Sequence, residues 1–546
     1  MDKIKKQTFL QASLILMFAN LTVRVIGAIF RIPIYKLLGE LGYANYQHAY
    51  SLYQIFFTIS TAGLPVAIST MISVADLNKN YEEERKIFKL ALISFVIVGA
   101  VGSGAMMFGA GAYSEFVGNP NAAYSILILA PTLFFVCITS AFRGYFQGRQ
   151  NMIPTAISEI IEASGKLLIG IGAAMYSLSK YPGRLDIAAA FAISGLTVGS
   201  AVGVLYLYIK KLLTAPFRKR GWHEVPGDSY VGYPIKKSRE ILGDIIKLSL
   251  PIMMSSSIAS LAGMIDSFMM TRRLIDIGWA AETAVGTYGQ YYGLAVPFFS
   301  LPNTLVVPFA VSIIPVIAAA FSENNVHSIK STAESALRVS SMVAAPCAFG
   351  LMFLAKPILS LIYPERMDQV SATAPLLSIL GIAVIFVSMM TVTNAMLQAQ
   401  KQAMKTIISM ACGMIVKTVT SYILIGIPEI NRYGTPIGTC LCYLTIMALN
   451  FYFLAKYTKA LPKIRRTFVK PFVSGAIMAA FSVLCYIMTD KILNSPRIAA
   501  LFALVVAVAS YFISIIALKT LTKEDVLLLP KGAKLYEFMK KKNLIK

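Results

Sequence analysis

The feature that most restricts how this chain can fold is a succession of long apolar stretches along most of its 546 residues. Hydrophobic residues make up 57% of the sequence, charged residues only 14%, and the mean hydropathy is +0.67. A helix needs about 20 consecutive apolar residues to cross the hydrocarbon core of a bilayer. A soluble protein of this length would carry far more polar surface. The sequence therefore predicts an all-α polytopic membrane protein.

The apolar stretches predict about 14 transmembrane helices. Their ranges are 8–30, 46–75, 90–112, 122–142, 154–178, 187–209, 245–271, 286–320, 338–358, 371–397, 406–427, 435–455, 471–489 and 498–518. The first carries Arg24 and lacks a cleavage site of small residues, so we expect a retained helix rather than a signal peptide. The range 286–320 is long and rich in proline, which predicts a kink or a section outside the hydrocarbon.

The formal net charge of +24 arises from 50 lysines and arginines against 26 aspartates and glutamates. Most of the basic residues lie between apolar stretches, mainly in the segments that are cytoplasmic if the amino terminus is inside. Cytoplasmic loops of membrane proteins carry such an excess. We therefore expect a multi-pass protein of the bacterial plasma membrane with both termini in the cytoplasm, and no nucleic-acid partner.

Several kinds of active site have no counterpart in the sequence. All six cysteines fall inside apolar stretches, where thiols behave as small hydrophobic groups, and the three histidines lack metal-ligand spacing. No phosphate-binding loop pattern or nucleophile triad is found. We therefore expect no metal, no cofactor and no enzymatic activity such as ATP hydrolysis.

Two lysines, Lys166 and Lys417, lie near the middle of apolar stretches, and the sequences before them resemble each other. Segments 147–158 and 398–409 align at an offset of 251 residues. The pairs that recur at this offset are Thr155/Thr406, Ile157/Ile408, Ser158/Ser409 and Lys166/Lys417. A charge at mid-membrane depth costs roughly 2.5–3.5 kcal/mol, so it normally faces a partner or a wet cavity. The repetition predicts a pseudo-symmetric, electropositive cavity and a transporter of an anionic substrate.

The repeat and the longest basic loop together predict the domain organisation. We expect a first lobe of six helices over residues 1–210, a basic cytoplasmic linker over 211–244 and a second six-helix lobe over 245–456. Because six is even, the two lobes would have parallel topology. Two further helices over 457–519 and a basic cytoplasmic tail over 520–546 follow.

Arg24 and Arg31 are the strongest candidates for substrate binding besides the two lysines. They are seven residues apart in the first apolar stretch, so they share one face of the helix, about two turns apart. Arginine keeps its charge and presents a planar fork that binds phosphate oxygens in bidentate fashion. Arg31 alone is also compatible with a position at the outer membrane edge.

Acidic residues in the apolar stretches are candidates for ion pairs or for ion coupling. Glu162 precedes Lys166 by one turn, which favours a structural pair between them, and Glu159 lies one turn earlier. Lys417 has no such neighbour, because residue 413 is glycine. Asp266 is the other embedded acid, and Arg272, Arg273 or a base across the cavity is its expected partner.

Two clusters have simpler interpretations. Tyrosines recur at helical spacing at the start of the second apolar stretch and just before it, and we interpret them as an interfacial belt rather than as ligand-stacking residues. They are Tyr43, Tyr46, Tyr50 and Tyr53. The run 82–84 consists of three glutamates, which we interpret as a solvated charge run rather than as the catalytic acids of a glycosyltransferase or polymerase.

The segment 142–162, with the sequence FRGYFQGRQNMIPTAISEIIE, resembles a particular transporter family. It is similar to the polysaccharide-biosynthesis and stage V sporulation branch of the multidrug/oligosaccharidyl-lipid/polysaccharide exporter superfamily, and especially to MurJ-like lipid II flippases of Gram-positive bacteria. The resemblance extends over essentially the whole chain. Arg24-Val-Ile-Gly followed by Arg31 fits the family's cavity-lining run in helix 1, with one extra residue between the arginines. The arginines that Gram-negative members carry in helices 2 and 8 are missing here.

This resemblance implies a flippase that moves lipid II, an undecaprenyl-pyrophosphate-linked peptidoglycan precursor, to the outer leaflet by alternating access. The head group would enter the cavity while the polyprenyl tail stays in lipid. The chain would be monomeric, with the cell-wall synthesis machinery as partner. Two alternatives stay open: a flippase for a teichoic, capsular or spore-specific lipid-linked oligosaccharide, and a cation-coupled multidrug antiporter that uses the embedded carboxylates.

Overall fold

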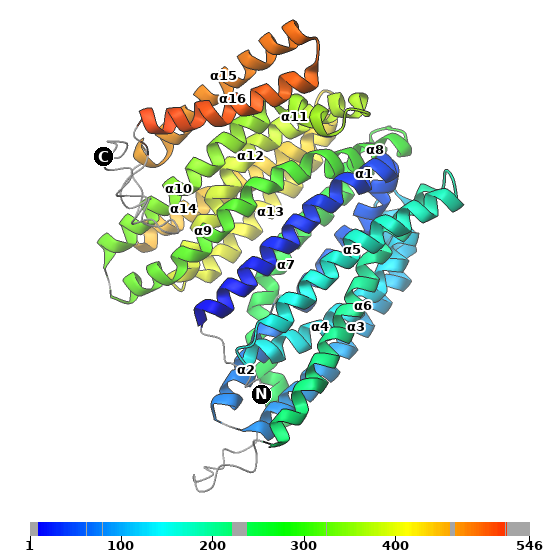
Figure 1. Ribbon diagram of the computed structural model, residues 1–546, viewed down its shortest axis with the longest axis vertical. Coiled ribbons are helices and arrows are strands. Elements are labelled where there is room, and N and C mark those ends of the chain that lie inside the picture. The colour runs from blue at the N-terminus through cyan, green and yellow to red at the C-terminus, as the bar shows by residue number, and fades with distance from the viewer. Residues whose placement is uncertain are drawn as a thin grey trace. The chain divides into compact units, whose positions relative to one another are not determined.

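The described residues fold entirely into helices and their connections, which confirms the predicted all-α class (Figure 1). The computed structural model describes residues 9–61, 63–78, 80–220, 237–323, 325–458, 465–518 and 520. Of the predicted basic linker over 211–244, residues 221–236 lie outside the described part, and so does the tail over 520–546 after residue 520. The chain forms two compact units, Met1–Gly289 and Gln290–Lys546, which we describe separately.

Unit 1 contains helices α1 to α8. They are α1 (Phe9–Thr61), α2 (Leu64–Leu77), α3 (Tyr81–Phe116), η1 (Pro120–Ala122), α4 (Ala123–Gly148), α5 (Ile153–Lys180), α6 (Leu185–Arg220), α7 (Ser238–Asp276) and α8 (Ala281–Gln290).

Unit 2 contains the remaining helices. They are η3 (Tyr291–Ala295), α9 (Val296–Ser322), α10 (Val326–Phe353), α11 (Ala355–Ile362), α12 (Met367–Ala399), α13 (Ala403–Ile425), η4 (Asn431–Tyr433), α14 (Gly434–Thr458), η5 (Arg465–Val469), α15 (Lys470–Leu493) and α16 (Pro496–Ala517).

Eleven helical stretches within the described residues are long and apolar enough to cross a membrane. Helices α5 and α7, which carry charged residues discussed below, are not among them, and the first stretch, Phe18–Leu77, runs through both α1 and α2. The predicted total of 14 helices and the predicted lobe boundaries stay predictions. The multi-pass helical architecture itself is confirmed.

The first two predicted helices differ from the structure. Instead of ending near residue 30, α1 continues to Thr61 with a kink at Gly39, whose φ of 66° and ψ of −170° suit glycine almost alone. The predicted second span, 46–75, is interrupted at Gly63, and Pro65 lies in the first turn of α2. Proline is favourable at a helix start and unfavourable inside a helix, which explains the break.

The proline-rich range 286–320 is irregular near its beginning. The backbone adopts a π-helical turn over Tyr291–Ala295, immediately before Pro297 in the first turn of α9. Beyond this turn, α9 continues as one helix to Ser322. The expected irregularity is therefore a π-helical turn at the start of the range.

The backbone turns confirm the internal repeat. Gln150 and Lys401, which are 251 residues apart, both have positive φ, 57° and 60°. The turn-closing hydrogen bonds match as well: the amide of Asn151 donates to Phe146 (3.0 Å), and that of Gln402 to Leu397 (2.8 Å). Positive φ is uncommon outside glycine. The α4–α5 and α12–α13 hairpins are therefore two copies of one motif.

A second pair of turns repeats at an offset of 245 residues. The side chains of Asn80 and Asn325 cap α3 and α10 by accepting hydrogen bonds from the amides of Glu83 (3.1 Å) and Ser328 (3.0 Å). Asparagine is among the preferred N-cap residues because its short side chain reaches these unsatisfied amides. The repeat therefore extends beyond the lysine-bearing hairpins.

Within unit 1, α5 and α6 lie side by side and pack through glycines (Figure 1). Gly195, Gly199 and Gly203 form a stripe on α6, and a methyl group at Gly165 of α5 would lie 2.5 Å from the Cα of Gly199. Small residues let transmembrane helices approach closely, so that van der Waals packing holds them together. This contact sets the position of α5 and of the charged residues it carries.

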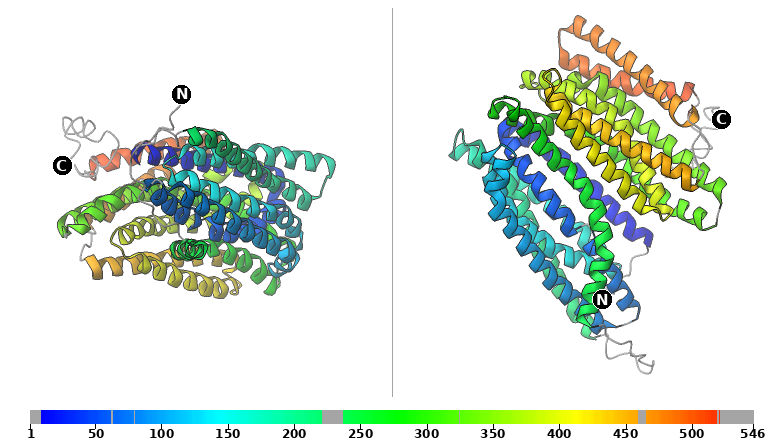
Figure 2. Two further views of the ribbon diagram at one scale, coloured as in Figure 1. Left: turned by 90° about the horizontal axis from the view of Figure 1, so that it is seen from below. Right: turned by 180° about the vertical axis from the view of Figure 1, so that it is seen from behind.

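Within unit 2, α15 and α16 form a hairpin that packs along α10 and α11 (Figure 2). The hydroxyl of Tyr511 donates to the carbonyl of Met342 (2.6 Å), and Lys470 donates to the carbonyl of Leu518 at the end of α16 (2.7 Å). Helices α9, α10, α12 and α14 contribute an apolar cluster, which includes Val306, Leu337, Met396 and Leu454. The last hairpin is thus an integral part of unit 2.

The glycine contact between α5 and α6 gives a stability prediction. Gly165→Ala should destabilise the protein by about 1–3 kcal/mol, because the neighbouring backbone cannot move aside without separating the helices. Gly172→Ala, on the same helix with open space around it, should leave stability unchanged or raise it slightly. Thermal unfolding of the purified protein in detergent measures both variants. Equal melting temperatures for the two would contradict this packing argument.

Candidate functional site

Three of the four predicted substrate-binding residues belong to unit 1. Arg24 and Arg31 lie on α1, and Lys166 lies on α5. Arg24 is exposed, whereas Arg31 and Lys166 are half-buried. The fourth residue, Lys417, lies on α13 of unit 2 and is only 3% exposed. The two lysines of the repeat therefore have different surroundings.

Lys166 is surrounded by aromatic rings from α1. Its Nζ lies 4.7 Å from the ring centroid of Tyr50, 5.0 Å from that of Phe30 and 5.8 Å from that of Tyr46. Ring faces attract cations with about 0.5–2 kcal/mol, more when water is excluded. We call this arrangement the Lys166 cage.

Arg31 follows Phe30 in sequence and adds a second positive charge beside the Lys166 cage. Its charge acts electrostatically on Lys166 and on Tyr43, Tyr46 and Tyr50. Among the described residues, no carboxylate lies within 4.0 Å of the charged groups of Arg24, Arg31 or Lys166. Cations without acidic partners are available to an anionic ligand.

Glu162 and Lys166 do not form the ion pair that their spacing allows. Glu162 instead accepts a hydrogen bond from Arg143 of α4 at 2.8 Å, and Arg143 also donates to Ser158 at 3.0 Å. The side chains of Arg143 and Glu162 are 11% and 14% exposed. A bidentate-capable guanidinium from the neighbouring helix competes better for the carboxylate than a lysine on the same helix.

Arg143 was not predicted as a site residue, although a signal for it exists in the sequence. It lies as far before the α4–α5 turn as Ser158 lies after it, and residues equally distant from a hairpin turn face each other across antiparallel helices. In the second copy of the hairpin, Asn394 and Gly413 occupy the positions of Arg143 and Glu162. Asn394 accepts a hydrogen bond from Asn450 at 2.7 Å. The repeat thus carries an ion pair in unit 1 and an amide pair in unit 2.

The remaining predicted charged residues of unit 1 are distributed over α5 and α7. Glu159 is half-buried, and its Oε2 has no hydrogen-bond partner among the described residues. Asp266 is 5% exposed. Arg272 is exposed and pairs with Asp276 at 3.2 Å rather than with Asp266, and Arg273 is half-buried. The i,i+4 spacing on one helix face explains the choice of Asp276.

The tyrosines predicted to form an interfacial belt are instead packed inside unit 1. Tyr43, Tyr46 and Tyr53 are at most 3% exposed. The ring centroids lie 5.9 Å apart for Tyr43 and Tyr46, 6.2 Å for Tyr46 and Tyr50, and 6.0 Å for Tyr50 and Tyr53. The spacing of three and four residues puts these rings on one helix face, which is turned toward the protein interior. This aromatic ladder supplies two walls of the Lys166 cage.

Another buried polar cluster surrounds His48, which is fully buried. Its Nδ1 lies 2.5 Å from the hydroxyl of Ser267, and its ring stacks on that of Tyr288 with centroids 4.1 Å apart. Ser51 lies 3.2 Å from the Tyr288 hydroxyl. Sequence reasoning missed this cluster because its members come from distant helices. No group of three or more metal-ligating side chains occurs in the described part of the chain.

The glutamate run at residues 82–84 is only partly solvated. Glu84 is fully buried, and its carboxylate lies 3.7 Å from Nε of Arg149 at the end of α4. Glu83 belongs to the N-terminal cap of α3, where Asn80 donates to its carboxylate at 3.0 Å. The run therefore caps α3 and joins it to α4.

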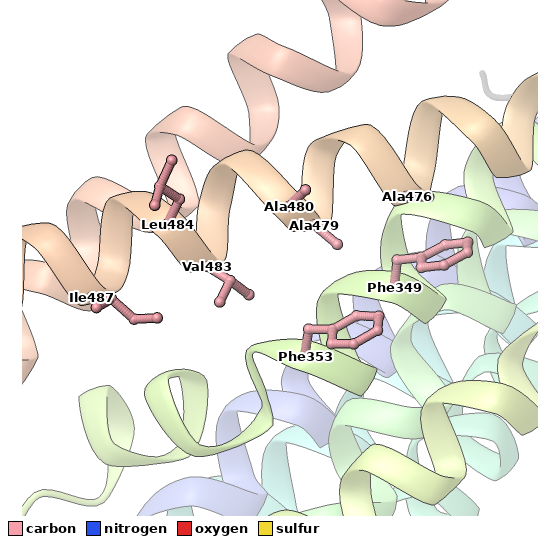
Figure 3. A pocket seen from close by; sticks show the side chains of 8 residues that line it. All are labelled: Phe349, Phe353, Ala476, Ala479, Ala480, Val483, Leu484 and Ile487. Atoms are coloured by element: carbon pink, nitrogen blue, oxygen red, sulfur yellow. The ribbon is translucent and has the colours of Figure 1, made fainter.

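Unit 2 contains an apolar pocket of about 450 Å³ between α10 and α15 (Figure 3). Figure 3 shows Phe349 and Phe353 of α10 on one wall and residues of α15 on the other. The pocket is lined by Phe349, Phe353, Ala476, Ala479, Ala480, Val483, Leu484 and Ile487. Side chains of this kind suit a hydrocarbon chain rather than a charged head group.

Comparison with known protein families identifies the chain's relatives. The model of the polysaccharide biosynthesis protein family matches residues 9–321, more than half of the chain. The chain belongs to this family. The model of the MatE family matches residues 251–423. The chain is thus a membrane transport protein of the multidrug/oligosaccharidyl-lipid/polysaccharide exporter superfamily, as its sequence resemblance predicted.

Two proteins of Bacillus subtilis (strain 168) are similar to this member of the polysaccharide biosynthesis protein family over most of their lengths. Stage V sporulation protein B is 24% identical over 461 residues, which cover 84% of this chain and 85% of that protein. The lipid II flippase MurJ is 22% identical over 498 residues, with coverages of 88% and 89%.

Among solved structures, the inward closed conformation of a lipid II flippase MurJ matches with a TM-score of 0.66. The match covers 92% of this chain and 98% of that chain at 15% sequence identity. Because the sequence identity is only 15%, the match confirms the fold alone.

The Arg143–Glu162 pair gives a prediction about stability. Arg143→Met should lower the melting temperature strongly, because it leaves Glu162 buried without its counter-charge, a loss of about 3–5 kcal/mol. The double variant Arg143→Met/Glu162→Met should be more stable than the single variant, because no uncompensated charge remains at that pair. Arg272→Met, which breaks an exposed pair, is the control and should have little effect. Additive losses in the double variant would contradict the pairing.

Proposed function

We propose that this chain is a flippase for an undecaprenyl-pyrophosphate-linked cell-wall precursor, with lipid II as the substrate. The observation that carries this proposal is the Lys166 cage with Arg31 beside it: two half-buried cations on α5 and α1, without a carboxylate within 4.0 Å among the described residues. A pyrophosphate offers the oxygens and the negative charge that such groups bind. Family membership and the similarity to a lipid II flippase support the same conclusion.

In the proposed cycle, Arg31 and Lys166 bind the pyrophosphate, and Arg24 attracts it along the same face of α1. Attraction between charges strengthens as water is excluded, so partial burial of Lys166 and Arg31 favours binding. Lys417 would act from the second half of the chain. The apolar pocket of unit 2 is suited to a hydrocarbon chain, either bulk lipid or the polyprenyl tail.

We further propose alternating access as the mechanism, in a monomeric protein of the plasma membrane with both termini in the cytoplasm. The excess of basic residues in the expected cytoplasmic segments supports this orientation. A membrane potential that is negative inside would assist outward movement of an anionic head group by about 2.3 kcal/mol per charge per 100 mV.

A second candidate is a flippase for a different lipid-linked oligosaccharide. The identity to stage V sporulation protein B, 24%, is as high as that to the lipid II flippase, 22%, so sequence similarity alone favours neither. Both substrates share the polyprenyl-linked phosphate chemistry that the proposed site would bind. Transport assays with lipid II and with a teichoic-type lipid-linked oligosaccharide distinguish the two.

Removal of the Lys166 charge tests the proposed function. Lys166→Met should lower lipid II transport in reconstituted vesicles by about tenfold to a hundredfold, because a hydrogen bond to a charged group is worth about 1.5–3 kcal/mol. It should also abolish complementation of a flippase-depleted strain while protein abundance stays normal. Lys180→Met, an exposed lysine at the end of the same helix, is the matched control and should transport normally. Full activity of a Lys166→Met/Lys417→Met double variant would refute the proposal.

A further inference from the structure

One polar group next to the Lys166 cage is not used by the proposed function. The hydroxyl of Tyr46 has no hydrogen-bond partner among the described residues, although its side chain is only 2% exposed. Buried hydroxyls are nearly always hydrogen-bonded, because an unsatisfied one loses its bonds to water without compensation. The hydroxyl is enclosed in this conformation, so an acceptor from outside the chain reaches it only when the surrounding side chains move.

The ring of Tyr46 is held on three sides. It stacks between Tyr43, at 5.9 Å and 25°, and Tyr50, at 6.2 Å and 14°, and it packs at 45° against Phe30. The same ring is one wall of the Lys166 cage, and the charge of Arg31 acts on its phenol group. A phenol donates one directional hydrogen bond. The donor thus belongs to a ring that is held in place and that also contacts the Lys166 ammonium.

The aromatic walls also determine how available the Lys166 ammonium is. A carboxylate beside it would neutralise the charge and would have to be displaced by an incoming anion. Ring faces hold a cation more weakly and leave its net charge unchanged. Phe30 and Tyr50, the two closest rings, therefore position the ammonium without competing with an anionic ligand.

We propose that the Tyr46 hydroxyl is a third donor to the anionic group that Arg31 and Lys166 bind, and that Phe30 and Tyr50 are positioning residues for Lys166. This inference rests on the proposed function and deepens it. The ligand class is a diphosphate ester, whose several oxygens allow one group to accept from an ammonium, a guanidinium and a phenol together.

The test compares two hydroxyl deletions in the same aromatic ladder. Tyr46→Phe keeps the ring and its stacking but removes the donor, and Tyr43→Phe makes the same chemical change outside the Lys166 cage. Purified full-length variants are titrated with undecaprenyl diphosphate in detergent, and melting temperatures are measured without ligand. Tyr46→Phe should weaken binding by about tenfold, while its ligand-free melting temperature equals or exceeds that of the wild type. Tyr43→Phe should bind normally.

Two results would overturn the role of the hydroxyl: unchanged affinity in Tyr46→Phe, or a lowered ligand-free melting temperature, which would show that the hydroxyl is bonded in the free protein. The positioning role requires that Tyr50→Leu weakens binding and that Tyr50→Phe, which retains the ring, restores it. Lys166→Met distinguishes failure of the proposed function from failure of the Tyr46 inference. If it binds undecaprenyl diphosphate as the wild type does, the proposed function fails, whereas loss of binding there with normal binding by Tyr46→Phe refutes only this inference.

Discussion

The charged groups of this protein are constrained by the cost of keeping an ion away from water, and the structure meets that cost in two ways. Arg143 and Glu162 neutralise each other across the α4–α5 hairpin. Lys166, one turn further along α5, is stabilised by aromatic faces instead. In the ion pair both charges are neutralised, whereas the aromatic rings leave the positive charge of Lys166 available to a ligand. The proposed transport function depends on this difference between two cations on neighbouring helices, Arg143 of α4 and Lys166 of α5.

Helix packing makes this separation possible. The glycine stripe of α6 draws α5 close, and the kink of α1 at Gly39 turns the following segment so that its tyrosines line the interior of unit 1. The ring of Tyr50 and the side chain of Phe30, which lie on opposite sides of that kink, then meet around Lys166. Without the bend, both residues could not approach one ammonium group from a single helix.

The repeat shows how two copies of one backbone motif acquire different chemistry. Both hairpins share the positive-φ residue and the hydrogen bonds of the turn, yet Asn394 and Gly413 replace the ion pair of the first copy. Lys417 is buried where Lys166 is half-buried. Backbone geometry tolerates these substitutions because the turn depends on local hydrogen bonds rather than on the side chains of the adjoining helices. We therefore assign the principal anion site to unit 1.

The sequence by itself determined the helical membrane class, most helix positions and the hairpin repeat, because apolar length and residue spacing are local properties. It also singled out Arg31 and Lys166 as candidates, since a charge inside an apolar stretch is conspicuous without any structure. Only the tertiary structure decided that Glu162 pairs with Arg143, that Glu84 is buried and that the tyrosines of α1 face inward. Those outcomes depend on how each helix is rotated and bent relative to its neighbours. Contacts between residues that are distant in sequence determine this rotation and bending, and local sequence patterns do not.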